Sequence, residues 1–254
     1  MHEHELWLTA LFNKHLAGPA NSFLEAVGMA PHGDSAHTAA AAHAAGPWTN
    51  WMVMQLLVVA LIVVFVAILK ARLSVDTPGT VQQMFEMLWQ SLYDLAHDVV
   101  GHGYKPHVYL FSTVFVFILF SNLLGIIPGF ESPTMSYYVP AGVAIIVFLY
   151  FNYWGFKENG PGYMKHFAGP VWWLMPFMLV VEIISVFIRP VSLTIRLFAN
   201  MLAGEQVTIA FLKLVPYVVP VIFMGLHTFV SFVQAFIFTV LTMAYVAGAV
   251  EHEH

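Results

Sequence analysis

Long apolar runs, rather than alternating apolar and polar residues, dominate the chain after residue 47. The first of them is WTNWMVMQLLVVALIVVFVAIL, from Trp48 to Leu69, and it contains no charged residue. About 20 apolar residues form a helix long enough to cross ~30 Å of hydrocarbon. We therefore predict a membrane-spanning helix over residues 48–69, with Lys70 and Arg72 just beyond its end.

Residues 77–100 follow a different pattern, in which apolar residues recur every three or four positions. These are Val81, Met84, Phe85, Leu88, Leu92, Leu95 and Val99. This spacing places them on one face of a helix, and acidic and amide residues fill much of the remainder. The helix is too polar to span, so we predict that it lies on the membrane surface with a solvated acidic face. Thr77 and Pro78 suit its N-cap and first turn.

Four further apolar segments complete the pattern. Residues 107–127 and 140–156 are predicted to form a hairpin of two spans, followed by two longer helices over 170–214 and 216–250. A helix of about 40 residues is roughly 60 Å long, twice the hydrocarbon thickness. The first long helix must therefore bend sharply at Pro190 or cross strongly tilted. The last two helices are expected to run antiparallel.

These elements predict an all-α polytopic membrane protein, with about five membrane-crossing helices and one amphipathic surface helix. Residues 48–254 form a single membrane domain, and residues 1–47 an extracytoplasmic segment with a mobile His/Ala-rich loop. Residues 6–24 within that segment are expected to form a short interfacial helix.

The distribution of basic residues predicts the topology. Lys70 and Arg72 lie in one loop, and Lys157 and Lys165 lie in the next loop but one. Basic residues favour the cytoplasmic side, so the N-terminus is predicted outside and the C-terminus in the cytoplasm.

Composition supports a membrane protein and excludes several kinds of site. Of 254 residues, 59% are hydrophobic and only 9% are charged, whereas a soluble domain typically carries about 25% charged residues. The net charge of -5 leaves no basic face for nucleic acid. The absence of cysteine excludes disulfides and thiolate catalysis. Thirteen histidines are present, but His32, His37 and His43 lack zinc-type spacing, so neither a metal nor a cofactor is expected.

Charged residues interrupt the first of the two long helices. Between residues 182 and 205 they are Glu182, Arg189, Arg196 and Glu205. A charge near the bilayer centre costs roughly 2.5–3.5 kcal/mol on insertion scales. Arg189 precedes Pro190 and is expected to reach lipid headgroups or cap a carbonyl. The other three indicate a hydrated or partnered route for ions or protons.

Helical geometry separates these groups. One stripe of the helix is formed by Arg189, Ser192, Arg196 and Asn200, because residues three, four and seven apart share a face. Glu182 lies ~21 Å before Arg196 along the axis, and Glu205 lies ~13 Å after it and points away from the stripe. Carboxylates can pass protons, whereas arginine stays protonated. Arg196 would therefore separate two proton paths.

The last helix carries polar residues but no Asp, Glu, Lys or Arg. His227 and Gln234 are seven residues apart and share a face. If the two helices fold back about Val215, Gln234 lies level with Arg196, and His227 lies within one helical turn of Glu205. We therefore expect an inner pair of Arg196 and Gln234 and an outer pair of Glu205 and His227.

The motif RPVSLTIRLFANMLAGE, followed by LHTFVSFVQAFIFTVLTMAYV, resembles subunit a of F-type ATP synthases. FSNLLGIIPG and GPGYMKHF are similar to that family too, so the resemblance covers most of the chain after Trp48. It implies a proton-translocating stator subunit of the bacterial inner membrane that does not itself hydrolyse ATP. The implied partners are the ring of c subunits, the b subunits of the peripheral stalk and membrane lipid.

The resemblance also implies a role for each polar residue of the two helices. Arg196 would be the essential arginine that faces the c-ring, with Asn200 and Gln234 close to it. Glu205 and His227 would belong to the half-channel open to the outside. Ser192 and Glu182 would mark the route toward the cytoplasm.

Two other functional classes remain open. A secondary transporter could hold a substrate at Arg196, but such folds usually show internal repeats, and the sequence shows none. A haem-bearing respiratory subunit needs histidines paired across spans, and His227 is the only histidine deep in an apolar segment. A purely structural anchor leaves Arg196 unexplained.

Overall fold

The computed structural model describes residues 6–26, 48–74, 79–101, 103–127, 129–159, 175–214 and 219–250. These residues form seven α-helices and one 3-10 helix, with no β-strand among them. The elements are α1 (Trp7–Ala26), α3 (Asn50–Ala71), α4 (Thr80–Val100), α5 (Val108–Leu124), η1 (Pro133–Met135), α6 (Tyr138–Asn159), α8 (Met175–Leu214) and α9 (Val219–Val250). The predicted all-α fold class is confirmed.

Four helices are long and apolar enough to cross a membrane: α3, α6, α8 and α9. The fifth apolar helix, α5, has only 17 residues, or about 25 Å of helix. It ends at Leu124, earlier than predicted, because the chain then turns at Gly125 and leads back to η1. The expected apolar segments are therefore all helical, and one of them is short.

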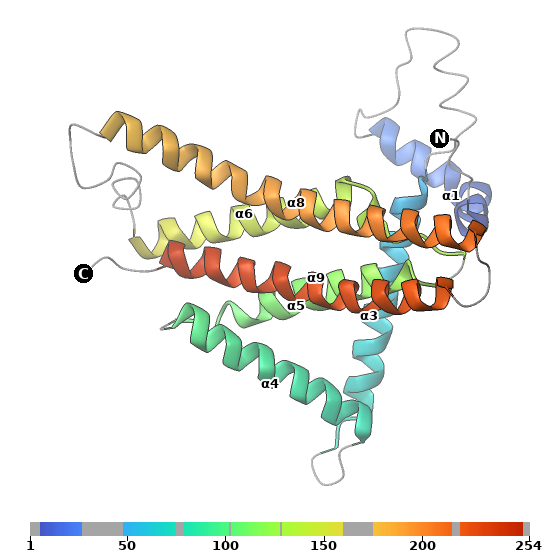
Figure 1. The fold of residues 1–254 in the computed structure, drawn as a ribbon, viewed down its shortest axis with the longest axis horizontal. Helices are drawn as coiled ribbons and strands as arrows, with labels where there is room; N and C mark the ends of the chain where they lie inside the picture. The colour runs from blue at the N-terminus through green and yellow to red at the C-terminus, as the bar shows by residue number, and fades with distance from the viewer. Residues whose placement is uncertain are drawn as a thin grey trace, which may run out of the picture.

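Helices α5, α6, α8 and α9 lie alongside one another, and α3 crosses their common direction (Figure 1). Helix α9 packs against α5, α8, α6 and α4, while α8 and α9 run antiparallel (Figure 1). Helices of 40 and 32 residues are longer than an upright crossing needs, which favours a tilted crossing for α8 and α9.

Helix α8 runs without interruption through Pro190. A proline inside a helix removes one backbone donor, but the turn that follows remains helical. There the Thr194 hydroxyl donates to the Pro190 carbonyl, with 2.8 Å between the oxygens. The helix is therefore continuous at Pro190, and a tilted crossing remains the prediction that fits its length.

The core lies where α9 meets its neighbours and is mostly apolar. Large aromatic side chains fill it, and small residues at the contacts let the helix axes approach closely, as is common in membrane bundles. The fully buried members include Phe111, Phe115, Phe151, Phe238, Leu197, Ala96, Ala144 and Ala235.

Helix α4 begins at Thr80 with Gly79 as its N-cap, later than predicted; Thr77 and Pro78 lie outside the described residues. Its buried residues, Leu92 and Ala96, both lie in its second half. Val81 and Met84, expected on the packed face, are 58% and 68% exposed. The first half of α4 therefore extends beyond the core.

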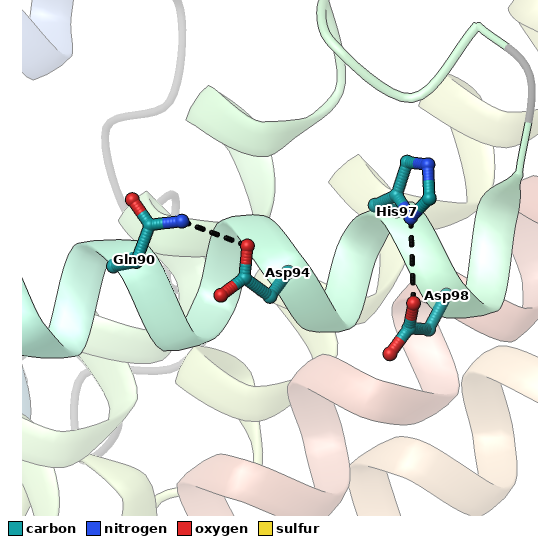
Figure 2. Close-up of polar contacts among 4 residues, drawn as sticks. All are labelled: Gln90, Asp94, His97 and Asp98. Atoms are coloured by element: carbon teal, nitrogen blue, oxygen red, sulfur yellow. Dashed lines mark hydrogen bonds and ion pairs between the residues drawn. The ribbon is translucent and has the colours of Figure 1, made fainter.

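Several polar side chains of α4 pair with one another along the helix. Gln90 donates to Asp94 at 2.8 Å, and His97 Nδ1 lies 3.3 Å from Asp98 Oδ1 (Figure 2). Both pairs are exposed, as expected of a solvated surface.

Helix α1 packs against the start of α3 through short polar contacts. The Asn13 side chain donates to the Trp48 carbonyl and accepts from the Trp48 N–H, at 3.2 and 3.0 Å. The Leu6 N–H donates to Asn50 Oδ1 at 3.3 Å. The short helix predicted for residues 6–24 is present, and the His/Ala-rich stretch after it lies outside the described residues.

Candidate functional site

Arg196 lies at the boundary between the packed and the open sides of α8. Leu193 and Leu197 are buried in the core, whereas Ile195 is exposed. The Arg196 side chain is partly buried. Within the described part of the chain it has no ion pair or hydrogen bond. It is thus a fixed positive charge, held by a rigid helix and open to a group from outside this chain.

Asn200 and Gln234 join α8 to α9 one helical turn from Arg196. The Asn200 side-chain N–H donates to Gln234 Oε1 at 2.9 Å. Gln234 is only 3% exposed, and its Nε2 is buried without a hydrogen-bond partner. Two of the predicted residues are thereby brought together, and Gln234 pairs with Asn200 rather than with Arg196.

His227 lies against the backbone of α8 at Gly204. A Cβ atom added at Gly204 would lie 2.9 Å from His227 Nδ1 and 3.0 Å from Cε1. Only glycine at position 204 therefore leaves room for the imidazole ring. The other ring nitrogen, Nε2, is buried and has no hydrogen-bond partner.

Two cavities meet at His227. One has a volume of about 240 Å³ and is lined by residues of α8 and α9, including Asn200, Gly204 and Val230. The other has a volume of about 250 Å³ and is lined by α8, α9 and the turn after α5, including Glu205. His227 forms part of the wall of both. The imidazole thus borders both a cavity lined by a carboxylate and a cavity lined by the Asn200 amide.

Glu205 faces the second cavity together with His227, as expected for the outer pair. Its Oε2 is buried without a hydrogen-bond partner. Thr208 and Phe130 line the same space, so the cavity wall is largely apolar around one carboxylate and one imidazole.

Glu182 is paired with Arg189 at the other end of the polar stripe. Arg189 Nη2 lies 3.8 Å from Glu182 Oε1, and the guanidinium carbon lies 5.3 Å from the centre of the Tyr245 ring. Arg189, predicted to reach lipid headgroups or cap a carbonyl, thus contacts Glu182 and Tyr245 within the chain. Ser192 is partly buried, one turn from both Arg189 and Arg196.

A second polar cluster, not predicted from the sequence, ties η1 to α5 and α9. The Thr134 hydroxyl donates to Asn122 Oδ1 at 2.7 Å, and the Asn122 side-chain N–H donates to the Ser231 carbonyl at 3.4 Å. The Ser132 hydroxyl donates to the Ser121 carbonyl at 2.8 Å. All five residues are buried, which demands that most of their polar atoms be bonded.

Two features of the sequence point to this cluster. Ser121 and Asn122 stand in the largely apolar run of α5, and Ser231 lies between His227 and Gln234 on one face of α9. The hydroxyl oxygens of Ser121 and Ser231 have no partner and are buried. Nothing in the sequence marks Tyr245 or Gly204, because their roles arise only where α8 meets α9.

The described residues contain no group of three or more His, Asp or Glu side chains placed to hold a metal ion. The three histidines considered above, at positions 32, 37 and 43, lie outside these residues.

Comparison with known proteins identifies the family. The family model for the ATP synthase A chain matches residues 52–247. The chain is 54% identical over 245 residues to ATP synthase subunit a of Solibacter usitatus, covering 96% of this chain and all of that protein. It is 43% identical to ATP synthase subunit a of Koribacter versatilis, covering 99% of each. With Bdellovibrio bacteriovorus ATP synthase subunit a it shares 47% identity, over 67% of this chain and 75% of that one. The chain belongs to the ATP synthase subunit a family.

Proposed function

We propose that this chain is the proton-translocating stator subunit of a bacterial ATP synthase, with two offset half-channels on either side of Arg196. In this proposal it hydrolyses no ATP itself and requires no cofactor. Its partners are a ring of c subunits, whose carboxylates meet Arg196, and the b subunits of the peripheral stalk. It lies in the inner membrane with its N-terminus outside and its C-terminus in the cytoplasm.

The position of His227 carries the proposal. It lines both cavities, one shared with Glu205 and one with Asn200. An imidazole can accept a proton at one nitrogen and release one from the other. A proton taken up by Glu205 from outside would pass His227 and reach the second cavity, where the bonded Asn200 and Gln234 side chains lie. Arg196 lies one helical turn from Asn200 on α8.

Arg196 ends this path because a guanidinium does not give up its proton in proteins. A carboxylate on a c subunit would take the proton before it reaches Arg196, then move away through lipid. On its return from the other side, the protonated carboxyl group would approach Arg196. It would release its proton there, because the positive charge attracts the carboxylate that forms. The positive charge thus prevents a continuous proton wire between the two half-channels.

The route toward the cytoplasm would begin at Ser192 and continue past Glu182. Arg189 holds the Glu182 carboxylate in an ion pair and stacks on Tyr245 of α9. Arg189 and Tyr245 therefore join the predicted residues as groups that position Glu182. The alternative of a transporter with its substrate at Arg196 receives less support, because Arg196 lines neither of the two cavities at His227.

The test uses membrane vesicles that contain the assembled complex. Arg196→Ala and Arg196→Lys should both abolish ATP synthesis driven by a proton gradient; the lysine variant fails because its amine can lose a proton when desolvated. Ile195→Ala changes the exposed neighbour on the same helix and should retain synthesis. Normal ATP-driven proton pumping in Arg196→Ala vesicles would overturn the proposal.

A further inference from the structure

An apolar groove lies between α3, α4 and α5, away from the polar residues of α8 and α9. Its volume is about 310 Å³. Ten of its twelve lining residues are apolar or aromatic, and the other two are Ser112 and Thr113. The Thr113 hydroxyl already donates to the Tyr109 carbonyl of its own helix.

The helices splay apart to leave this groove open. Helix α3 packs against α5, and α4 packs against α5 and α9. Near the end of α3, the Gln82 side chain of α4 bonds both the N–H and the carbonyl of Ser74, at 3.1 and 3.0 Å. Hydrogen bonds therefore close the groove where the end of α3 meets α4. Ring contacts line its sides, Phe65 with Phe85 and Trp89 with Tyr109.

The groove lies at the depth of the hydrocarbon. The α3 residues that line it fall between Val59 and Val66, in the middle and second half of the Asn50–Ala71 span. At that depth the surrounding solvent is lipid, and water does not stably fill an apolar space. An acyl chain matches the groove in both location and chemistry.

A positive charge stands at the end of the same stripe. Lys70 lies four residues beyond Val66 and seven beyond Val63, so the three share one face of α3. The rise of a helix places Lys70 about 6 Å below Val66 along the axis. Lys70 is exposed and so positioned to bind a phosphate. Arg72 lies two residues further on and points from another face.

Ser112 provides the second polar feature. It is only 9% exposed, lines the groove, and its hydroxyl oxygen is buried without a hydrogen-bond partner. A buried hydroxyl without a partner is costly. Because this oxygen has almost no accessible surface, Ser112 contributes to the wall of the groove and not a hydrogen bond to its occupant.

We propose that this groove binds one phospholipid, with an acyl chain between α3, α4 and α5 and its phosphate at Lys70. The bound lipid fills the groove and holds the first half of α4, which otherwise extends beyond the core, in place against α3. The site is independent of the proton path and would serve to attach α3 to the rest of the bundle.

The experiment measures phospholipid retained by the full chain, alone and in its complex, by native mass spectrometry after detergent extraction from phosphatidylglycerol-containing membranes. Wild type should retain one phospholipid per chain. Val63→Trp inserts an indole at the groove and should lower occupancy about tenfold or more, since displacing even two methylenes accounts for that factor. Val64→Trp is the matched control: Val64 is 54% exposed, close to the 61% of Val63, but does not line the groove.

The headgroup is tested in the same way. Lys70→Gln should lower retention about fivefold, as expected for the loss of one basic residue near a lipid phosphate, and Arg72→Gln should not. Absence of bound phospholipid in wild type, or equal retention in Val63→Trp and Val64→Trp, overturns the proposal. So does crosslinking of a cysteine at position 63 to a helix of another subunit in the complex, because a protein segment would then fill the groove.

Discussion

Gly204 matters for the site because it has no side chain. The His227 ring occupies the space where any other side chain would begin. That contact brings the imidazole to the surface of α8, between the cavity of Glu205 and the cavity of Asn200. A single methyl group would therefore act on the proton path without altering any titratable residue.

Gly204→Ala is expected to displace the His227 ring and slow proton flow through the complex. Replacing glycine by alanine in a helix normally stabilises it by about 1 kcal/mol, but overpacking here should cost about 1–3 kcal/mol. Gly225→Ala on α9 is the control, because its added Cβ meets nothing within 4 Å.

The measurements are passive proton flow in vesicles and the thermal stability of the complex. Gly204→Ala should lower both, and Gly225→Ala should leave proton flow unchanged. Equal behaviour of the two variants would show that His227 does not depend on the space at Gly204.

At this scale the sequence was informative for charged and polar residues within apolar runs. Arg196, Glu205 and Gln234 stand out because their burial in lipid is costly. Local composition does not specify which residue another will pack against, so the roles of Gly204 and Tyr245 were not predicted. The sequence also could not reveal that Arg189 would neutralise Glu182, since pairs seven residues apart depend on side-chain conformation.

The short helix η1 packs against several of the longer helices. This three-residue helix lies against α3, α5, α6 and α8, and Pro133 and Thr134 are buried. Non-helical backbone at membrane depth is tolerated where protein surrounds it. The cluster of Asn122, Ser132 and Thr134 supplies the hydrogen bonds that hold η1 in this position.

Gly125→Ala should displace η1 and destabilise the protein. The added Cβ would lie 2.6 Å from Ser132 Cβ and 3.0 Å from the Ser132 backbone nitrogen, and backbone cannot move aside cheaply. We expect a loss of about 1–3 kcal/mol, measured as a lower thermal midpoint in detergent.

The matched variant is Gly142→Ala in α6, where the new Cβ meets nothing within 4 Å. It should leave the thermal midpoint equal or slightly higher. A Gly125→Ala protein as stable as wild type would mean that η1 is free to shift.

The positions of the helices were predictable and their ends were not. Apolar runs and the 3.6-residue period located every apolar helix and α4, because these patterns extend over many residues. The three residues of η1 carry no period. Helix α4 begins at Thr80 because Gly79 takes the extended N-cap conformation.

On the scale of the whole molecule, the α8–α9 hairpin sets the register of the site. Asn200 with Gln234, Gly204 with His227, and Phe211 stacked on Phe223 at 4.3 Å are successive contacts along it. The predicted fold-back about Val215 places paired residues within one helical turn of these contacts. The tilt of the hairpin, in contrast, follows from packing against α5 and α6, which no single segment encodes.

The chain is expected to cross the membrane an odd number of times. Because the sequence contains no cysteine, single-cysteine variants report topology cleanly. Leu73→Cys follows α3 and Tyr137→Cys precedes α6, and both native residues are exposed. An impermeant maleimide should label position 73 from the cytoplasm and position 137 from outside. Labelling of both from one side would contradict the predicted order of crossings.

The placement of charge on the hairpin has an electrical consequence. Helix α9 contains no Asp, Glu, Lys or Arg, and the membrane part of α8 carries two carboxylates, Glu182 and Glu205, and two guanidinium groups, Arg189 and Arg196. With all four ionised, their charges cancel, and Lys213 in the last turn of α8 leaves the hairpin with one net positive charge. A membrane voltage does work of about 2.3 kcal/mol per unit charge per 100 mV. The field would therefore act on the whole hairpin as on a single positive charge, and the four groups that surround the proton path would add no net force.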